Sequence, residues 1–126
     1  MITKFQKNLP ISNIDISDEL ERLGFSDFKI LTKDKLPSLP PLNNSQFLVI
    51  NLDNSVGNGT HWVTLCRRNN TLEYYDSFGL TYGKTVDDYI DRHADVDVYI
   101  NTEREQHIDS ARCGFYCMRF IQDFYN

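Results

Sequence analysis

The chain has 126 residues, of which 40% are hydrophobic, 13% aromatic and 25% charged, and we expect one globular domain over residues 1–126. A net charge of −5 disfavours nucleic-acid binding, because proteins that bind nucleic acids usually carry a basic face. The apolar runs are too short to cross a membrane, and the first residues lack the apolar stretch of a signal peptide.

The segment SDELERLGF predicts a short helix near the start of the chain. Ser17 and Asp18 form the N-cap signal, Leu20 and Leu23 share one helical face, and Gly24 ends the helix. The segment DKLPSLPPLNN follows it over residues 34–44. Its three prolines predict an extended loop that wraps across the domain.

Strand patterns dominate the centre of the chain. Residues 46–53 (QFLVINLD) form a short apolar run between polar residues and predict a buried strand. Residues 61–68 (HWVTLCRR) and 71–78 (TLEYYDSF) both alternate on either side of Asn69-Asn70. Alternation around such a turn predicts a β-hairpin.

The last third of the chain predicts a turn and short helix over residues 79–94, a strand over 95–101, and a helix over 110–125. Asp109 or Ser110 is the expected N-cap of the last helix. The predicted fold is therefore α+β, with a mainly antiparallel sheet packed against a helix that carries Cys113 near its N-terminus.

The three cysteines need separate explanations. An odd number of cysteines in a chain with no secretory signal favours free thiols. We expect Cys66, which alternates inside a strand, and Cys117, one helical turn after Cys113, to pack in the core. The C-x₃-C spacing with distant histidines is poor for zinc, so we expect no metal site.

Cys113 differs from the other two, because it lies in the first turns of the last helix. The unpaired N–H groups of a helix N-terminus favour a thiolate, and Gly114 beside it allows a substrate to approach closely. A thiolate nucleophile needs a histidine as base and a third group that orients the histidine.

Three histidines are candidates for the base. His61 begins a strand after a glycine-rich loop, where it can point into a groove. His93 lies in a charged stretch and is expected to be solvated, and spacing alone leaves His107 open. The hairpin brings Asp76 near His61, since the two lie almost symmetrically about its turn, with Glu73 as the fallback acid.

Three sequence blocks occur in a recognisable order. The segments GTHWVTL, YYDSFG and QHIDSARCGFYC resemble the signature blocks of adenovirus-type cysteine proteases, which are related in fold to ubiquitin-like-protein proteases. That family has the chain order His, acid, Gln, Cys, which here is His61, Asp76, Gln106 and Cys113. The matching stretch, Gln46–Phe124, is most similar to proteases of virophages and related large mobile elements.

The resemblance implies a role for each residue. Cys113 would attack the scissile carbonyl, His61 would take its proton, and Asp76 would orient the imidazole. The side chain of Gln106 and the backbone N–H of Cys113 would stabilise the oxyanion. Trp62 is expected to shield the His–Asp pair from water.

The resemblance also implies a narrow substrate groove. We expect Trp62, Gly59 and Gly114 to contact the substrate, with the loop that contains Gly59 forming one wall.

The implied function is that of a thiol endopeptidase that cleaves capsid precursor proteins during particle maturation, in the virion and in the viral factory of the host cytoplasm. Its partners would be the protein substrate and a peptide activator; no cofactor, metal or membrane is expected, and we expect a monomer. Two alternatives remain open: a protease that removes ubiquitin-like tags, and a non-catalytic peptide-binding module of the same fold.

Overall fold

A computed structural model describes residues 13–52, 61–103 and 113–126. In chain order the elements are α1 (Asn13–Arg22), β1 (Phe28–Thr32), the 3₁₀ helix η1 (Lys33–Ser38), β2 (Phe47–Asn51), β3 (Trp62–Arg68), β4 (Thr71–Tyr75), α2 (Lys84–Ile90), β5 (Asp97–Ile100) and α3 (Cys113–Phe124). The predicted α+β class is confirmed. Within the described residues, every helix is too short or too polar to cross a membrane.

The five strands form one sheet in the order β1-β2-β3-β4-β5. The three central strands pair antiparallel, as predicted, and include the expected β3–β4 hairpin. The edge strands β1 and β5 pair parallel with β2 and β4. A parallel pair needs a crossover connection, which η1 with the following loop supplies at one edge and α2 supplies at the other.

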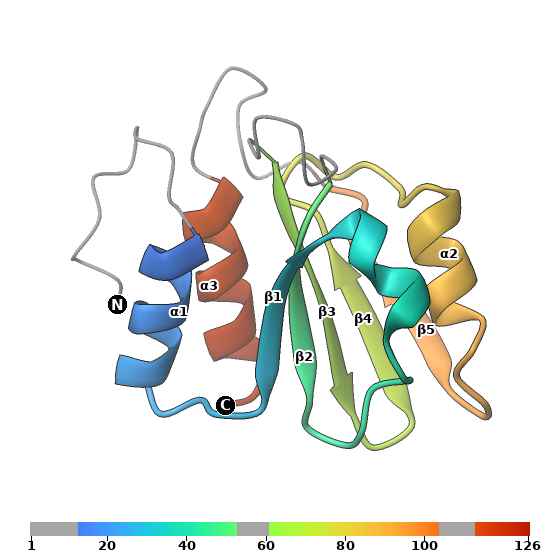
Figure 1. Ribbon diagram of the computed structural model, residues 1–126, viewed down its shortest axis with the longest axis horizontal. Coiled ribbons are helices and arrows are strands. Elements are labelled where there is room, and N and C mark those ends of the chain that lie inside the picture. Colours follow the sequence, from blue (N-terminus) through green and yellow to red (C-terminus); the bar gives the residue numbers. More distant parts are fainter. Residues whose placement is uncertain (1–12, 53–60, 104–112) are drawn as a thin grey trace.

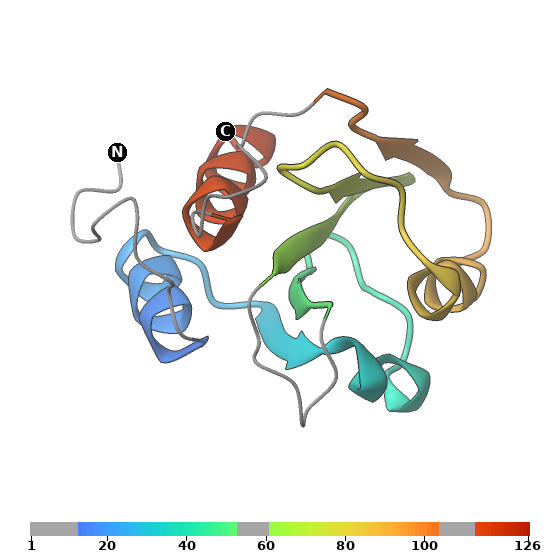
Figure 2. The same ribbon diagram turned by 90° about the horizontal axis from the view of Figure 1, so that it is seen from above.

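Helices cover both faces of this sheet (Figures 1 and 2). Helices α1 and α3 lie side by side on one face, and η1 and α2 lie on the other. Alternate side chains of β3 point to opposite faces of the sheet: Trp62 and Cys66 pack with α3, while Val63 and Leu65 pack with α2. The sheet is therefore buried on both sides at its centre.

Helix α1 begins earlier than the sequence predicts. Ser17 and Asp18 lie inside the helix instead of capping it. The reason is tertiary packing: Ile16 and Leu20 are spaced by four residues and are both 0% exposed in the layer shared with α3. Gly24 follows the helix with a φ of +96°, a conformation that suits glycine, so the predicted end of the helix is confirmed.

Two features of the N-terminal third escaped the sequence reasoning. Strand β1 pairs along its whole length with β2, from Phe28 opposite Phe47 to Thr32 opposite Asn51. The proline-rich segment was predicted to be extended throughout, and this is wrong for Lys33–Ser38, which form η1. A short 3₁₀ helix tolerates Pro37, because the fixed φ of proline fits a helical turn.

Candidate active site

The β2–β3–β4 register places His61 and Asp76 at one end of the sheet. His61 directly precedes β3, and its carbonyl accepts a hydrogen bond from the Leu52 N–H at 2.9 Å. The β3–β4 pairing ends with Thr64 opposite Tyr75, so its continuation sets Asp76 opposite Val63. Val63 and His61 point to the same face, so His61 and Asp76 are diagonal neighbours.

The two side chains are in contact. Nε2 of His61 lies 3.0 Å from Oδ1 of Asp76, which is the proximity that the hairpin predicts. The Asp76 side chain is 1% exposed and that of His61 is 18% exposed. Because a carboxylate only accepts hydrogen bonds, Nε2 carries the proton, and the lone pair of Nδ1 can accept another. The arrangement suits a general base.

A tight turn fixes the carboxylate of Asp76. Its Oδ1 also accepts the Phe78 backbone N–H at 2.8 Å, and its carbonyl accepts the Gly79 N–H at 2.8 Å. The turn requires a φ of +72° at Gly79, which glycine adopts without steric cost. The turn formed by the sequence DSFG thus orients the Asp76 carboxylate through hydrogen bonds between neighbouring residues.

An aromatic ring covers one face of the imidazole, and sequence reasoning missed it. The rings of Phe78 and His61 are stacked with centroids 4.4 Å apart and planes inclined by 8°. Trp62, the residue predicted to shield the pair, is 7% exposed and belongs to the cluster under α1 and α3. Phe78 lies in the turn after β4, beyond the last β3–β4 pair, so strand alternation alone does not predict its position.

Helix α3 begins at the same end of the sheet. Arg68, the last residue of β3, donates a hydrogen bond to the carbonyl of Phe124, the last residue of α3, at 2.8 Å. Seven strand residues span about 23 Å and twelve helical residues about 18 Å. Helix α3 therefore runs alongside β3 in the same direction, and both begin at the upper end of the sheet in Figure 1. This brings the backbone of Cys113 to the end that holds His61.

Several predicted residues lie outside the described part of the chain. These are Gly59, Gln106 and His107, together with the capping candidates Asp109 and Ser110. Their roles stay predictions. Gly114, which follows Cys113, is described and is buried in α3.

Glu73, the fallback acid, is not the partner of His61. It pairs with Cys66 in the middle of the hairpin, three residues before Asp76. The pleat therefore turns its side chain to the opposite face from Asp76. Partial burial raises the pKa of Glu73 above its usual range.

The prediction that His93 is solvated is wrong. His93 is 9% exposed, and its Nε2 accepts the Leu42 N–H at 2.8 Å. Its Nδ1 lies 3.2 Å from the carbonyls of Tyr89 and Ile90 at the end of α2. Nε2 can accept the Leu42 N–H only when the ring is neutral, and burial lowers the pKa of His93 in the same sense. The ring ties the proline-rich segment to α2.

Cys66 and Cys117 are free thiols and are both 0% exposed, so their prediction as core residues is confirmed. Burial raises the pKa of Cys66 to about 12, which keeps it protonated. Its sulfur lies 3.6 Å from the Thr64 hydroxyl. Neither thiol is available as a nucleophile, and among the described residues no three His, Cys, Asp or Glu side chains gather as metal ligands do.

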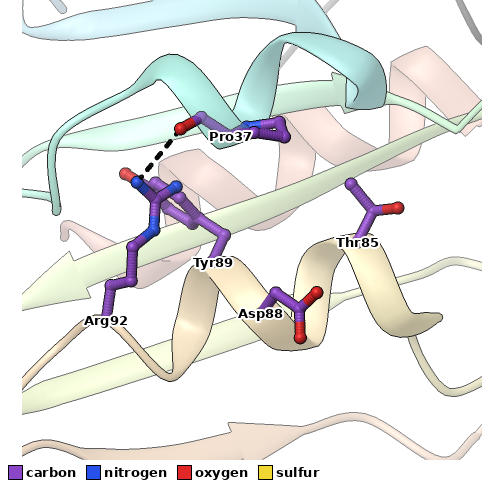
Figure 3. A pocket seen from close by; sticks show the side chains of 5 residues that line it. All are labelled: Pro37, Thr85, Asp88, Tyr89 and Arg92. Carbon is purple, nitrogen blue, oxygen red and sulfur yellow. Dashed lines mark hydrogen bonds between the residues drawn. The ribbon is translucent and has the colours of Figure 1, made fainter.

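A surface depression of about 290 Å³ lies away from this site, between η1 and α2 (Figure 3). Its lining residues are Pro37, Thr85, Asp88, Tyr89 and Arg92. The Arg92 guanidinium extends from the end of α2 toward the Pro37 carbonyl, 3.4 Å away. The depression follows from the docking of η1 on α2, and its one carboxylate, Asp88, is paired with Lys84.

No protein-family model and no curated protein matches this sequence. Solved structures do match: the ASFV pS273R protease superposes with a TM-score of 0.70 at 17% identity, and its selenomethionine form with 0.71 at 18%. Each alignment covers 95% of this chain and 60% of the other, so this chain spans about 60% of the length of those structures. The chain therefore has the fold of a viral protease.

Proposed function

We propose that this chain is a cysteine endopeptidase with Cys113 as nucleophile. The observation that carries the proposal is the partly buried hydrogen bond between His61 and Asp76, at the end of the sheet where α3 begins with Cys113. A paired imidazole beside a helix N-terminus is the environment that activates a thiol. The fold shared with a viral protease supports the same reading.

The proposed reaction follows from these roles. His61 accepts the Cys113 proton on Nδ1, and the thiolate sulfur attacks the scissile carbonyl carbon. The backbone N–H of Cys113 and the side-chain amide of Gln106 stabilise the oxyanion. His61 then protonates the departing amine, which leaves a thioester. Water, deprotonated by His61, attacks the thioester, and the acid product leaves as the thiol is restored.

The natural substrate that we propose is a viral capsid precursor, cleaved during particle maturation in the virion and the viral factory of the host cytoplasm. The resemblance to proteases of virophages and related elements supports this choice. We propose Gly59, Trp62 and Gly114 as the residues that contact the substrate. The enzyme would act as a monomer, with a peptide activator as a further partner.

Alkylation of Cys113 by iodoacetamide at pH 7, followed by mass spectrometry, tests the nucleophile without knowledge of the substrate. We expect Cys113 to react faster than a free cysteine in a peptide, and His61→Gln to remove this advantage. Cys66 and Cys117 are buried and serve as unreactive internal controls. A rate equal to that of the peptide thiol would instead favour the non-catalytic peptide-binding module.

Co-expression with a capsid precursor tests the substrate. Processing that Cys113→Ala abolishes is the expected result, and processing that this variant leaves unchanged would contradict the proposal. Cleavage of a di-glycine fusion of a ubiquitin-like protein, without cleavage of the precursor, would identify a tag-removing protease instead.

A further inference from the structure

Asn101 joins the two parallel strands β4 and β5 just beyond their last backbone pair. That pair is Tyr74 opposite Ile100, so Asp76 and Asn101 both lie past the ends of their strands. The Asn101 backbone N–H lies 3.4 Å from the Tyr74 carbonyl. The side chain of Asn101 makes the next connection between the strands.

The carboxamide of Asn101 binds both backbone polar groups of Asp76. Its Oδ1 accepts the Asp76 N–H at 2.9 Å, and its Nδ2 donates to the Asp76 carbonyl at 2.6 Å. The same Nδ2 lies 3.2 Å from the Glu103 carbonyl, which holds the amide in its orientation. The Asn101 side chain thus takes the place of a pair of backbone hydrogen bonds between the strands, at the residue that contacts His61.

Only a carboxamide meets this requirement well. It presents one donor and one acceptor side by side, matching the N–H and C=O of a single residue. An aspartate offers acceptors alone, and an alanine offers neither group. Asparagine at this position is therefore explained by Asp76 and not by strand propensity, which is low for asparagine.

We propose that Asn101 is a positioning residue that aims the Asp76 carboxylate at His61. The proposal rests on the proposed function, in which His61 is the general base. With its backbone held by Asn101 and Gly79, Asp76 keeps only its side-chain torsions, and the Phe78 N–H fixes those. Loss of the two hydrogen bonds from the Asn101 side chain frees the backbone of Asp76 and misaligns the contact between its carboxylate and His61 Nε2.

The test compares Asn101→Ala with Asn44→Ala. Asn44 is a matched control, because its side chain also accepts a backbone N–H, that of Asn69 at 2.7 Å, but at the far end of the hairpin. In Asn101→Ala we expect Cys113 alkylation by iodoacetamide at pH 7 to slow by about 10- to 100-fold, the size expected for a misplaced catalytic group. Asn44→Ala should retain the wild-type rate.

A second readout separates this proposal from the proposed function. The ¹⁵N chemical shifts of the His61 ring report which nitrogen carries the proton, whether or not Cys113 is a nucleophile. We expect the Nε2–H tautomer in the wild type and in Asn44→Ala, and a mixture with the Nδ1–H tautomer in Asn101→Ala. If His61→Gln leaves alkylation unchanged, the protease proposal fails while the tautomer still tests Asn101.

The isosteric Asn101→Asp variant carries the test if Asn101→Ala does not fold. It keeps an acceptor for the Asp76 N–H but cannot donate to the Asp76 carbonyl, so we expect the same loss of the Nε2–H tautomer. A wild-type tautomer and a wild-type alkylation rate in the variants that fold would overturn the proposal. Urea unfolding of each variant confirms that it is folded under the assay conditions.

Discussion

The aromatic ring of Phe78 lies parallel to the imidazole of His61, with 4.4 Å between centroids and 8° between planes. Asp76 meets the same imidazole at its edge, 3.0 Å from Nε2. The stacking partner thus fixes the plane of the ring, and the carboxylate fixes its rotation within that plane. Both contacts come from a three-residue stretch after β4, so one short turn orients the proposed base.

Phe78→Ala should slow Cys113 alkylation by about 10-fold or more, because the imidazole loses one wall and gains rotational freedom. Phe78→Tyr keeps a six-membered ring and should stay close to the wild type. The measurement is the iodoacetamide rate at pH 7.

Phe120→Ala is the matched control for this substitution. Phe120 stacks on Tyr75 with nearly the same geometry, 4.5 Å and 10°, but on the sheet face under α3. Its loss should lower the free energy of unfolding by about 1 kcal/mol or more without slowing alkylation of the folded protein. Equal effects of the two alanine variants on the rate would mean that Phe78 acts through stability alone.

Substitutions of Asp76 should lower the rate of Cys113 alkylation to different degrees. Asp76→Asn keeps an oxygen that can accept from both the Phe78 N–H and His61 Nε2, and loses only the charge. Asp76→Ala loses both orientation and charge, so its alkylation rate should fall by about 10- to 100-fold, and that of Asp76→Asn by less. A rate for Asp76→Asn as low as that for Asp76→Ala would show that the charge, not the orientation, is what matters.

The local parts of this site could be predicted from the sequence. A hairpin turn at Asn69-Asn70 sets the register of both strands, and the register places Asp76 next to His61. Counting along two strands that share a tight turn needs no knowledge of the rest of the fold.

The non-local parts could not be predicted in the same way. Asn101 is 25 residues from Asp76, and their pairing depends on a parallel crossover through α2. Likewise, β1 depends on its pairing with β2 across η1. The charged neighbours of His93 in the sequence predict a solvated side chain. Its burial instead depends on the proline-rich segment, whose Leu42 N–H binds the His93 ring.

Arg92→Lys should destabilise the protein although it keeps the charge. The guanidinium donates to the carbonyls of Leu36 at 2.6 Å and Leu39 at 2.7 Å, and it lies 4.8 Å from the centre of the Tyr89 ring. A lysine cannot reach two carbonyls in a planar fork, so the free energy of unfolding should fall by about 1 kcal/mol in urea titrations.

Lys84→Ala is the control for Arg92. Lys84 is also on α2 and pairs with Asp88 at 3.1 Å, but both side chains are largely exposed. Its loss should change stability by less than about 0.5 kcal/mol. Both variants should leave Cys113 alkylation unchanged, because the contacts of both side chains lie within η1, the residues after it and α2. A slower rate in either variant would show that η1 and α2 influence the site.

Protonation of His93 should weaken the fold at acidic pH. Burial is the main cause of its lowered pKa, and the nearby Arg67 and Arg92 lower it further. The folded state therefore favours the neutral ring, so this stabilisation is complete above the unfolded pKa of about 6.5 and is lost as the pH falls through the lower folded value. The difference in unfolding free energy between wild type and His93→Gln, measured in urea from pH 8 to pH 4, should shrink toward acid. A difference that stays constant over this range would show that the Leu42–His93 hydrogen bond does not depend on the neutral ring.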